Sequence, residues 1–347
     1  MPETAPRHPV VELTRVRLLE YLREPEVIFW VFAFPVLMAL ALGVAFRVST
    51  APDVPVGVLA GPGADRVVER LDAADGLAAE AVQPADAVRA LRDGAVHLIV
   101  VPGDPPTYRY DPTRPESLAA RFAVDDALQR AAGRGDLWEA RHERVVAPGS
   151  RYIDWLIPGL LGMNVMGTGM WGIGFAVVQA RTLKLLKRLV ATPMKRRHYL
   201  LSHILARLAF LGLEVGLLLG FAWLVFDVPV QGSLVSLAAV TVLGAMTFAG
   251  IGLLVASRAQ TIEAVSGLMN VTMVPMWVLS GVFFSSEQFP AVVQPLITAL
   301  PLTALNVALR GIMIDGVSLG ALAGPLGILA AWGIGSFGVA IRIFRWQ

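Results

Sequence analysis

Six long apolar stretches divide the chain, and polar segments of very different length separate them. The stretches cover residues 27–46, 155–178, 204–226, 234–256, 264–285 and 319–341. A helix that crosses the hydrocarbon core of a bilayer needs about 20 mostly apolar residues, and an open strand cannot satisfy its backbone there. Each stretch therefore predicts one transmembrane helix. The first is longer than the apolar region of a signal peptide, which has about 7–15 residues, so we expect it to be retained as span one.

The segment between the first two spans is polar and follows a different periodicity. It predicts three strands and three helices, the strands at 54–59, 96–101 and 106–110 and the helices at 64–72, 84–92 and 117–130. Strands that alternate with short helices indicate a small α/β domain, and about 100 residues can bury a core of their own. The predicted fold is thus an all-α bundle of six transmembrane helices with an α/β domain inserted between spans one and two.

These patterns divide the chain into four parts. Apolar residues on one side of 10–22 predict an amphipathic helix at the membrane surface, within residues 1–26. Span one occupies 27–47 and the α/β domain 48–152. The remaining residues, 153–347, form a domain of five spans.

The distribution of charge predicts the orientation in the membrane. The loop 179–200 holds seven lysines and arginines and no acid, and such an excess is typical of cytoplasmic loops. In a chain with six spans this loop lies on the same side as both termini. We therefore expect both termini in the cytoplasm and the α/β domain outside it.

Composition agrees with a membrane protein and excludes several kinds of site. Only 16% of the residues are charged, whereas soluble proteins have about 25%. There is no cysteine, which excludes disulfides, thiolate metal sites and a cysteine nucleophile. No G-x-x-x-x-G-K-[ST] sequence occurs, so we expect no ATP hydrolysis by this chain, and no cofactor or metal bound by it. His97 stands alone in a predicted strand, which indicates a structural role.

The basic loop 179–200 also contains the pattern of a short, stiff amphipathic helix. Leucines recur at helical spacing, basic residues occupy the other face, and a proline ends the helix because it forces the preceding residue out of the α region. Two roles stay open on physical grounds, namely contact with anionic lipid headgroups and docking of a cytoplasmic protein. The residues that define the pattern are Leu183, Leu186, Lys187, Arg188, Leu189, Thr192 and Pro193.

Few charged or helix-distorting residues fall within the spans. Glu214 lies in the middle of span three, and Arg207 lies two turns before it on the same face, about 10 Å away by helix rise. We expect each to have a partner on another span, and both a substrate or gating role and an interhelical contact stay open for Glu214. Pro35 and Pro275 are expected to kink spans one and five. The candidates for the transport path or its gating are Glu214, Arg207, Glu263, Pro275, Ser280 and Gly281.

Four segments, in this order, resemble a known family. They are the N-terminal helix ending Leu-Arg-Glu-Pro at 22–25, the Leu-Lys-Arg-Leu-x-x-Thr-Pro loop at 186–193, Ser-Gly-Val-Phe-Phe at 280–284, and Leu-Pro-Leu-Thr at 300–303. The chain resembles, over nearly its whole length, the permease subunits of the ATP-binding-cassette (ABC) type 2 exporters. The second segment resembles the family's coupling helix, which docks into the ATPase. The fourth resembles the start of the family's re-entrant or amphipathic stretch before span six.

The resemblance implies a permease that moves a hydrophobic or amphipathic substrate, such as a drug, lipid or glycan, out of the cytoplasm or the inner leaflet. It implies a separate cytoplasmic ABC ATPase that handles ATP and Mg, and a second copy of the permease or a paralogue. The expected location is the bacterial cytoplasmic (inner) membrane, with lipid and no nucleic acid as partner. The alternative is an extracytoplasmic ligand sensor or interaction protein anchored in the membrane, without transport activity.

Overall fold

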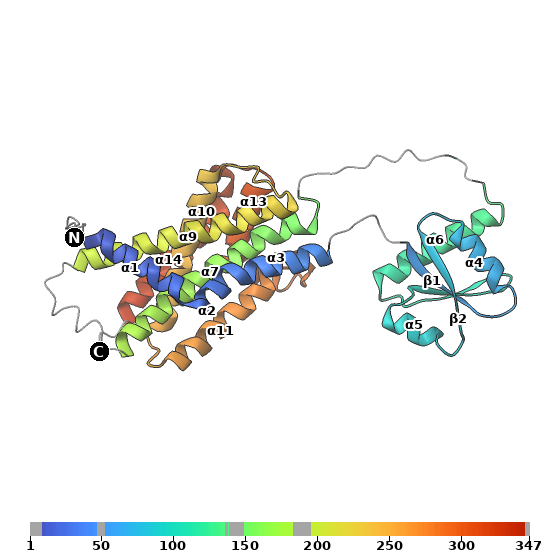
Figure 1. Ribbon diagram of the computed structural model, residues 1–347, viewed down its shortest axis with the longest axis horizontal. Helices are drawn as coiled ribbons and strands as arrows, with labels where there is room; N and C mark the ends of the chain where they lie inside the picture. The colour runs from blue at the N-terminus through green and yellow to red at the C-terminus, as the bar shows by residue number, and fades with distance from the viewer. Residues whose placement is uncertain (1–8, 47–52, 136–137, 139–148, 183–195, 344–347) are drawn as a thin grey trace, which may run out of the picture. The chain divides into compact units, whose positions relative to one another are not determined.

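The computed structural model describes residues 9–46, 53–135, 138, 149–182 and 196–343 (Figure 1). The chain forms two compact units. A helical unit comprises Met1–Arg47 and Val146–Gln347, and an α/β unit comprises Val48–Val145.

Six helical segments of the described residues are long and apolar enough to cross a membrane. They are Pro25–Ala45, Tyr152–Gln179, Leu205–Phe226, Leu234–Ala256, Ile262–Leu279 and Leu319–Ile343. The all-helical bundle with six apolar spans is therefore confirmed. The fifth span was predicted to reach residue 285, which is wrong: the helix ends at Leu279 because Gly281 turns the backbone to a left-handed φ of 69°.

The helices of this unit are α1 (Pro9–Arg23), α2 (Pro25–Ile28), α3 (Phe34–Ala45), α7 (Tyr152–Thr182), α9 (Arg196–Phe226), α10 (Leu234–Ala256), α11 (Ile262–Leu279), α12 (Gln294–Ala299), α13 (Pro301–Met313) and α14 (Ala323–Ile343). A π-helical turn, η1 (Phe29–Ala33), and two short 3-10 helices, η2 (Ser286–Gln288) and η3 (Leu319–Leu322), complete it. Helix α7 is central, because it packs against α3, α9, α10, α11 and α13. Its glycine-rich surface permits this close approach.

Span one is distorted next to its proline. Pro35 has no backbone N–H to donate to the carbonyl four residues earlier, on Val31. The preceding turn, η1, is a π-helix, in which the Phe34 N–H donates to Phe29 O. The Val31 carbonyl accepts a hydrogen bond from Asn164 Nδ2 on α7, at 2.9 Å. A polar side chain of span two thus satisfies the backbone group that the proline leaves open.

Helix α13 lies inside the helical unit, although it is too short to be a span. It packs against α7, α10 and α14, and every residue of it except Val307 is buried. Glu214 is therefore not the only charge buried in the helical unit, because only 8% of Arg310 is exposed. With 13 residues, α13 is shorter than the run of about 20 apolar residues that predicts a span, so the search for apolar stretches in the sequence did not identify it.

The α/β unit has the order β1 (Val54–Leu59), α4 (Ala64–Asp72), β2 (Leu77–Val82), α5 (Ala87–Asp93), β3 (Leu98–Val101), β4 (Thr107–Arg109) and α6 (Pro115–Ala131). Its sheet has the strand order β2-β1-β3-β4, in which β4 runs antiparallel to β3 and the other pairs are parallel. Helices α4 and α6 cover one face and α5 the other (Figure 1). Residues 48–152 therefore do contain strands that alternate with helices.

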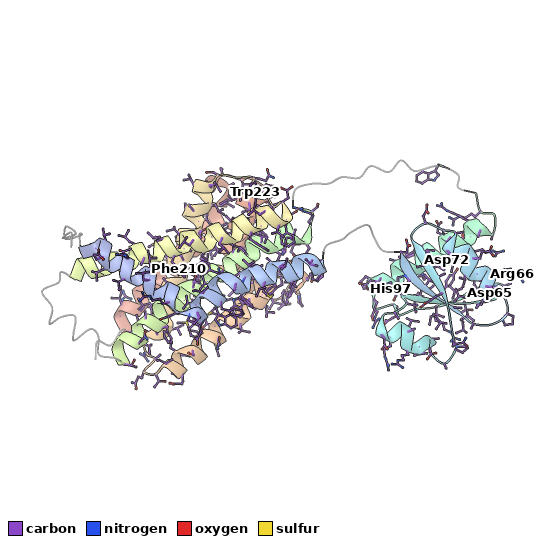
Figure 2. The ribbon with its side chains drawn as sticks, in the orientation of Figure 1. Asp65, Arg66, Asp72, His97, Phe210 and Trp223 are labelled. Atoms are coloured by element: carbon purple, nitrogen blue, oxygen red, sulfur yellow. The ribbon has the colours of Figure 1, made fainter. Side chains whose placement is uncertain are left out.

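The sequence pattern did not predict strand β2, which reads Leu-Ala-Ala-Glu-Ala-Val. Alanine and glutamate are poor strand formers, so the segment carries little local signal. It becomes a strand because it pairs along its length with β1, from Val54–Leu77 to Leu59–Val82. Asp72 at the end of α4, labelled in Figure 2, also accepts a hydrogen bond from the Ala79 backbone N–H at 2.8 Å.

Candidate functional site

The first polar cluster of the helical unit joins α7 and α9. Glu214 is 1% exposed, and its Oε1 lies 3.1 Å from the Thr168 hydroxyl of α7. Arg207 Nη2 donates to the same hydroxyl at 2.7 Å. That hydroxyl also lies 2.9 Å from the Asn164 carbonyl, so its proton is shared between two acceptors. Among the described residues, Glu214 Oε2 has no hydrogen-bond partner.

We predicted that Arg207 and Glu214 each have a partner on another span. The structure brings both to one residue, Thr168, which connects two charges that lie two turns apart on α9. Phe210, between them on α9 and labelled in Figure 2, is 2% exposed and packs its ring on Phe32 of span one at 5.2 Å. The sequence analysis did not identify Thr168. The feature that could have indicated it is a hydroxyl side chain between two glycines in an apolar span.

The second polar cluster joins α7, α13 and the loop after α11. Asn306 Nδ2 donates to Ser280 O at 2.9 Å, and Arg310 Nη2 donates to Gly281 O. Arg310 also reaches Trp155 O of α7, at 3.4 Å from Nε and 3.3 Å from Nη2. Its guanidinium carbon lies 3.5 Å from the centre of the Trp155 ring, in the geometry of a cation–π contact. Two side chains of α13 thus fix the loop that carries Ser280 and Gly281.

Glycines on α7 make this arrangement possible. A Cβ on Gly162 would overlap Asn306 Oδ1, and a Cβ on Gly159 would lie 2.5 Å from Val282 O. Real Cβ atoms essentially never come within 3.0 Å of such atoms. The polar side of α13 therefore lies directly on the backbone of α7.

A third set of contacts fixes the beginning of α7. Arg151 pairs with Asp154 at 2.7 Å and donates to the carbonyls of Phe226 and Asp227, at the end of α9, at 2.9 and 3.0 Å. The Tyr152 hydroxyl donates to Phe283 O in the loop after α11, at 2.9 Å. These contacts therefore join the start of α7 to the end of α9 and to the loop after α11, at one end of the helical unit.

Comparison with known proteins decides the family. Residues 124–314 match the profile of the family described as ABC-2 type transporter, which is 191 of the 347 residues. The chain belongs to the ABC-2 type transporter family. It is also 28% identical over 174 residues to ABC transporter G family member 20 of Dictyostelium discoideum. That match covers 50% of this chain but only 24% of the relative, so the chain corresponds to about a quarter of the relative's length.

Membership in the ABC-2 family confirms the predicted resemblance and makes the chain a membrane component of an ABC transporter. The matched region includes α7, α9, α13 and both polar clusters. Within the described ranges, no group of histidines and carboxylates could hold a metal ion.

The other predicted site residues of this ABC-2 chain do not join the polar clusters. Glu263 is exposed in the first turn of α11, where a carboxylate complements the helix dipole, and Pro275 is exposed further along α11. The residues predicted to contact an ATPase lie outside the described residues; they are Leu183, Leu186, Lys187, Arg188, Leu189, Thr192 and Pro193.

Polar contacts of the α/β unit have a structural character. The Tyr108 hydroxyl of β4 donates to Asp125 Oδ1 of α6 at 3.2 Å, and burial, followed by the Asp125 charge, raises the pKa of Tyr108 to about 12. Asp126 pairs with Arg130 at 3.0 Å on the exposed side of the same helix. His97, labelled in Figure 2, comes directly before β3, where its backbone N–H donates to Pro55 O at 2.9 Å.

Proposed function

We propose that this chain is the permease subunit of an ATP-driven exporter, energised by a separate cytoplasmic ABC ATPase that binds ATP and Mg. The observation that carries the proposal is the ABC-2 match over 124–314, on a bundle of six apolar helices. No G-x-x-x-x-G-K-[ST] sequence occurs in the 347 residues, which agrees with ATP binding outside them.

The proposed route of coupling follows the chain. Residues 183–193 belong to the connection 183–195 between α7 and α9, the two helices that carry the Arg207–Thr168–Glu214 cluster. A force that the ATPase exerts on this segment would therefore act first on these two helices. Glu214 is proposed to take part in gating, because a buried carboxylate with an unpaired oxygen gains from any rearrangement that supplies a partner.

The proposed orientation places both termini and residues 183–193 in the cytoplasm and the α/β unit outside, in a bacterial inner membrane. The seven basic residues of the loop 179–200 support it. The proposed cargo is hydrophobic or amphipathic, since few of the buried side chains described in the helical unit are charged, namely Asp154, Glu214 and Arg310. Two copies, or one copy with a paralogue, would form the path.

The test is co-expression with a candidate ABC ATPase, followed by pull-down in detergent and measurement of ATP turnover. The variant Leu186→Asp with Leu189→Asp replaces two apolar side chains of the predicted coupling segment. Complex formation and ATP turnover should both fall at least about tenfold, because each aspartate would be desolvated in the docked state.

A matched control is Val88→Asp with Phe122→Asp, which adds the same two charges to side chains that are 76% and 63% exposed on the α/β unit. This control should bind the ATPase like the wild type. If the coupling variant binds the ATPase as well as the control does, or if no ABC ATPase co-purifies with the wild type, the exporter proposal is wrong. A membrane-anchored sensor would then be the better account.

A further inference from the structure

Arg310 differs from the other two arginines whose contacts hold the transmembrane helices together. Arg151 pairs with Asp154, and Arg207 reaches Glu214 through Thr168. In the part of the chain that the structure describes, Arg310 contacts two carbonyl oxygens and an aromatic ring, but it forms no ion pair with a carboxylate. It is therefore a buried cation without an anion.

Unpaired polar atoms gather around this cation. Ser280 Oγ, Asn306 Oδ1 and Trp155 Nε1 are buried and have no hydrogen-bond partner among the described residues. Ser280 is 1% exposed and Asn306 is fully buried. Through other atoms, Ser280 contacts Asn306, and Trp155 contacts Arg310. A serine hydroxyl and an indole N–H can each donate a hydrogen bond, so this cluster holds two donors and one acceptor, Asn306 Oδ1, that have no partner among the described residues.

Such an arrangement is costly if it has no ligand. Buried polar groups in proteins are almost always paired, and a charge inside a membrane protein marks a substrate or ion pathway by default. Here α13 lies directly on Gly159 and Gly162 of α7, which leaves no room for a ligand between the two helices in the state described. The donors become available when α13 and the loop after α11 separate from α7, and a ligand that binds this open state shifts the chain alone towards it.

We propose that Arg310, with Ser280 and Trp155, binds the phosphate group of an anionic amphiphile during transport. A guanidinium forms bidentate hydrogen bonds with phosphate oxygens, and phosphate has more acceptor oxygens than a carboxylate for the neighbouring hydroxyl and indole donors. The inference rests on the proposed transport function, because it assumes that the helices open to a substrate. It narrows that function to amphiphiles with a phosphate headgroup.

The test measures equilibrium binding of radiolabelled dodecyl phosphate to the full chain in dodecyl maltoside micelles. The detergent has the same tail and a neutral headgroup, so specific binding reports the phosphate. Saturable binding is expected for the wild type. Arg310→Gln should weaken it at least about tenfold, the effect of one lost charge-assisted hydrogen bond. Arg258→Gln removes an exposed positive charge next to α10 and should leave binding within about twofold of the wild type, because surface charges contribute little.

Ser280→Ala separates binding from structure. The Ser280 hydroxyl has no partner among the described residues, so its removal should leave the thermal midpoint unchanged or raise it, while weakening dodecyl phosphate binding about threefold or more. This variant decides the question if Arg310→Gln does not fold. Unchanged binding in Ser280→Ala, equal weakening in Arg258→Gln, or displacement by an equal concentration of inorganic phosphate would each overturn the proposal.

The binding assay uses the chain alone and needs no ATPase. If the wild type shows no specific binding of dodecyl phosphate but does couple to the ATPase, only this inference is refuted. If binding depends on Arg310 but no ATPase couples to the chain, only the exporter proposal is refuted.

Discussion

Two glycines of α7, Gly162 and Gly172, offer a direct test of how closely α7 and α13 pack. A Cβ at Gly162 would overlap Asn306 Oδ1, whereas a Cβ at Gly172 would meet no atom within 4 Å. Both positions are helical and lie in the same apolar span. Gly162→Ala and Gly172→Ala therefore make the same chemical change on one helix, with and without a neighbour in the way.

The expected size of the difference follows from two terms. Alanine is favoured over glycine in a helix interior by roughly 0.5–1 kcal/mol, and this gain is common to both variants. Overpacking a filled interior costs about 1–3 kcal/mol, and this applies to Gly162→Ala alone. The helix term cancels in the comparison, so Gly162→Ala should be less stable than Gly172→Ala by about 1–3 kcal/mol.

Thermal unfolding of the purified chain in dodecyl maltoside measures this difference. In a domain of about 150–250 residues 1 kcal/mol corresponds to roughly 2–4 °C, so the two midpoints should differ by at least about 2 °C. Adding Asn306→Ala to Gly162→Ala removes the overlapping oxygen. Asn306→Ala should therefore lower the stability of the Gly162→Ala variant by less than it lowers that of the wild type, and the difference, the coupling energy, should be about 0.5–3 kcal/mol. Equal midpoints for the two glycine variants would refute the close contact between α7 and α13.

Three further predictions concern other parts of the molecule. Asn164→Leu leaves the Val31 carbonyl unpaired and should destabilise the chain by about 1–3 kcal/mol in thermal unfolding, whereas an unchanged midpoint would mean that another donor takes over. Glu214→Gln removes the charge but keeps an oxygen for the hydrogen bond, so we expect unchanged ATPase binding in pull-downs and reduced ATP turnover; full turnover would exclude a gating role for the charge. Because the pKa of Tyr108 is raised to about 12 in the folded state, its contribution to stability is present below the unfolded pKa of about 10 and is lost as the pH rises towards 12. Tyr108→Phe should remove this loss in the alkaline unfolding of the full chain, and an identical alkaline midpoint for both proteins would contradict it.

Much of the α/β unit could be predicted from sequence because its elements carry local signals. Apolar alternation marks β1, and one-sided apolar spacing marks α4, which begins at the predicted residue. Strand β2 could not be predicted, because its alanines and glutamate fit a strand only when β1 supplies the neighbouring hydrogen bonds.

The candidate site divides in the same way. The charges Glu214 and Arg207 were visible as exceptions in an apolar span. The left-handed turn at Gly281 was also visible, because the Ser-Gly pair at 280–281 stands out at the end of span five. The partners of these residues were not visible. Thr168 and Asn306 are uncharged residues in apolar surroundings, and only the packing of α7 against α9 and α13 gives them a role.

The sequence by itself determined the six spans, because a backbone in lipid must satisfy its hydrogen bonds locally and therefore forms a helix wherever about 20 apolar residues follow one another. Tertiary structure alone decided which polar groups meet inside the bundle. Arg310 is 155 positions from Trp155, and Asn164 is 133 positions from Val31, yet both pairs are in contact. Contacts over such separations depend on which glycine-lined faces allow two helices to approach, and no local pattern records that choice.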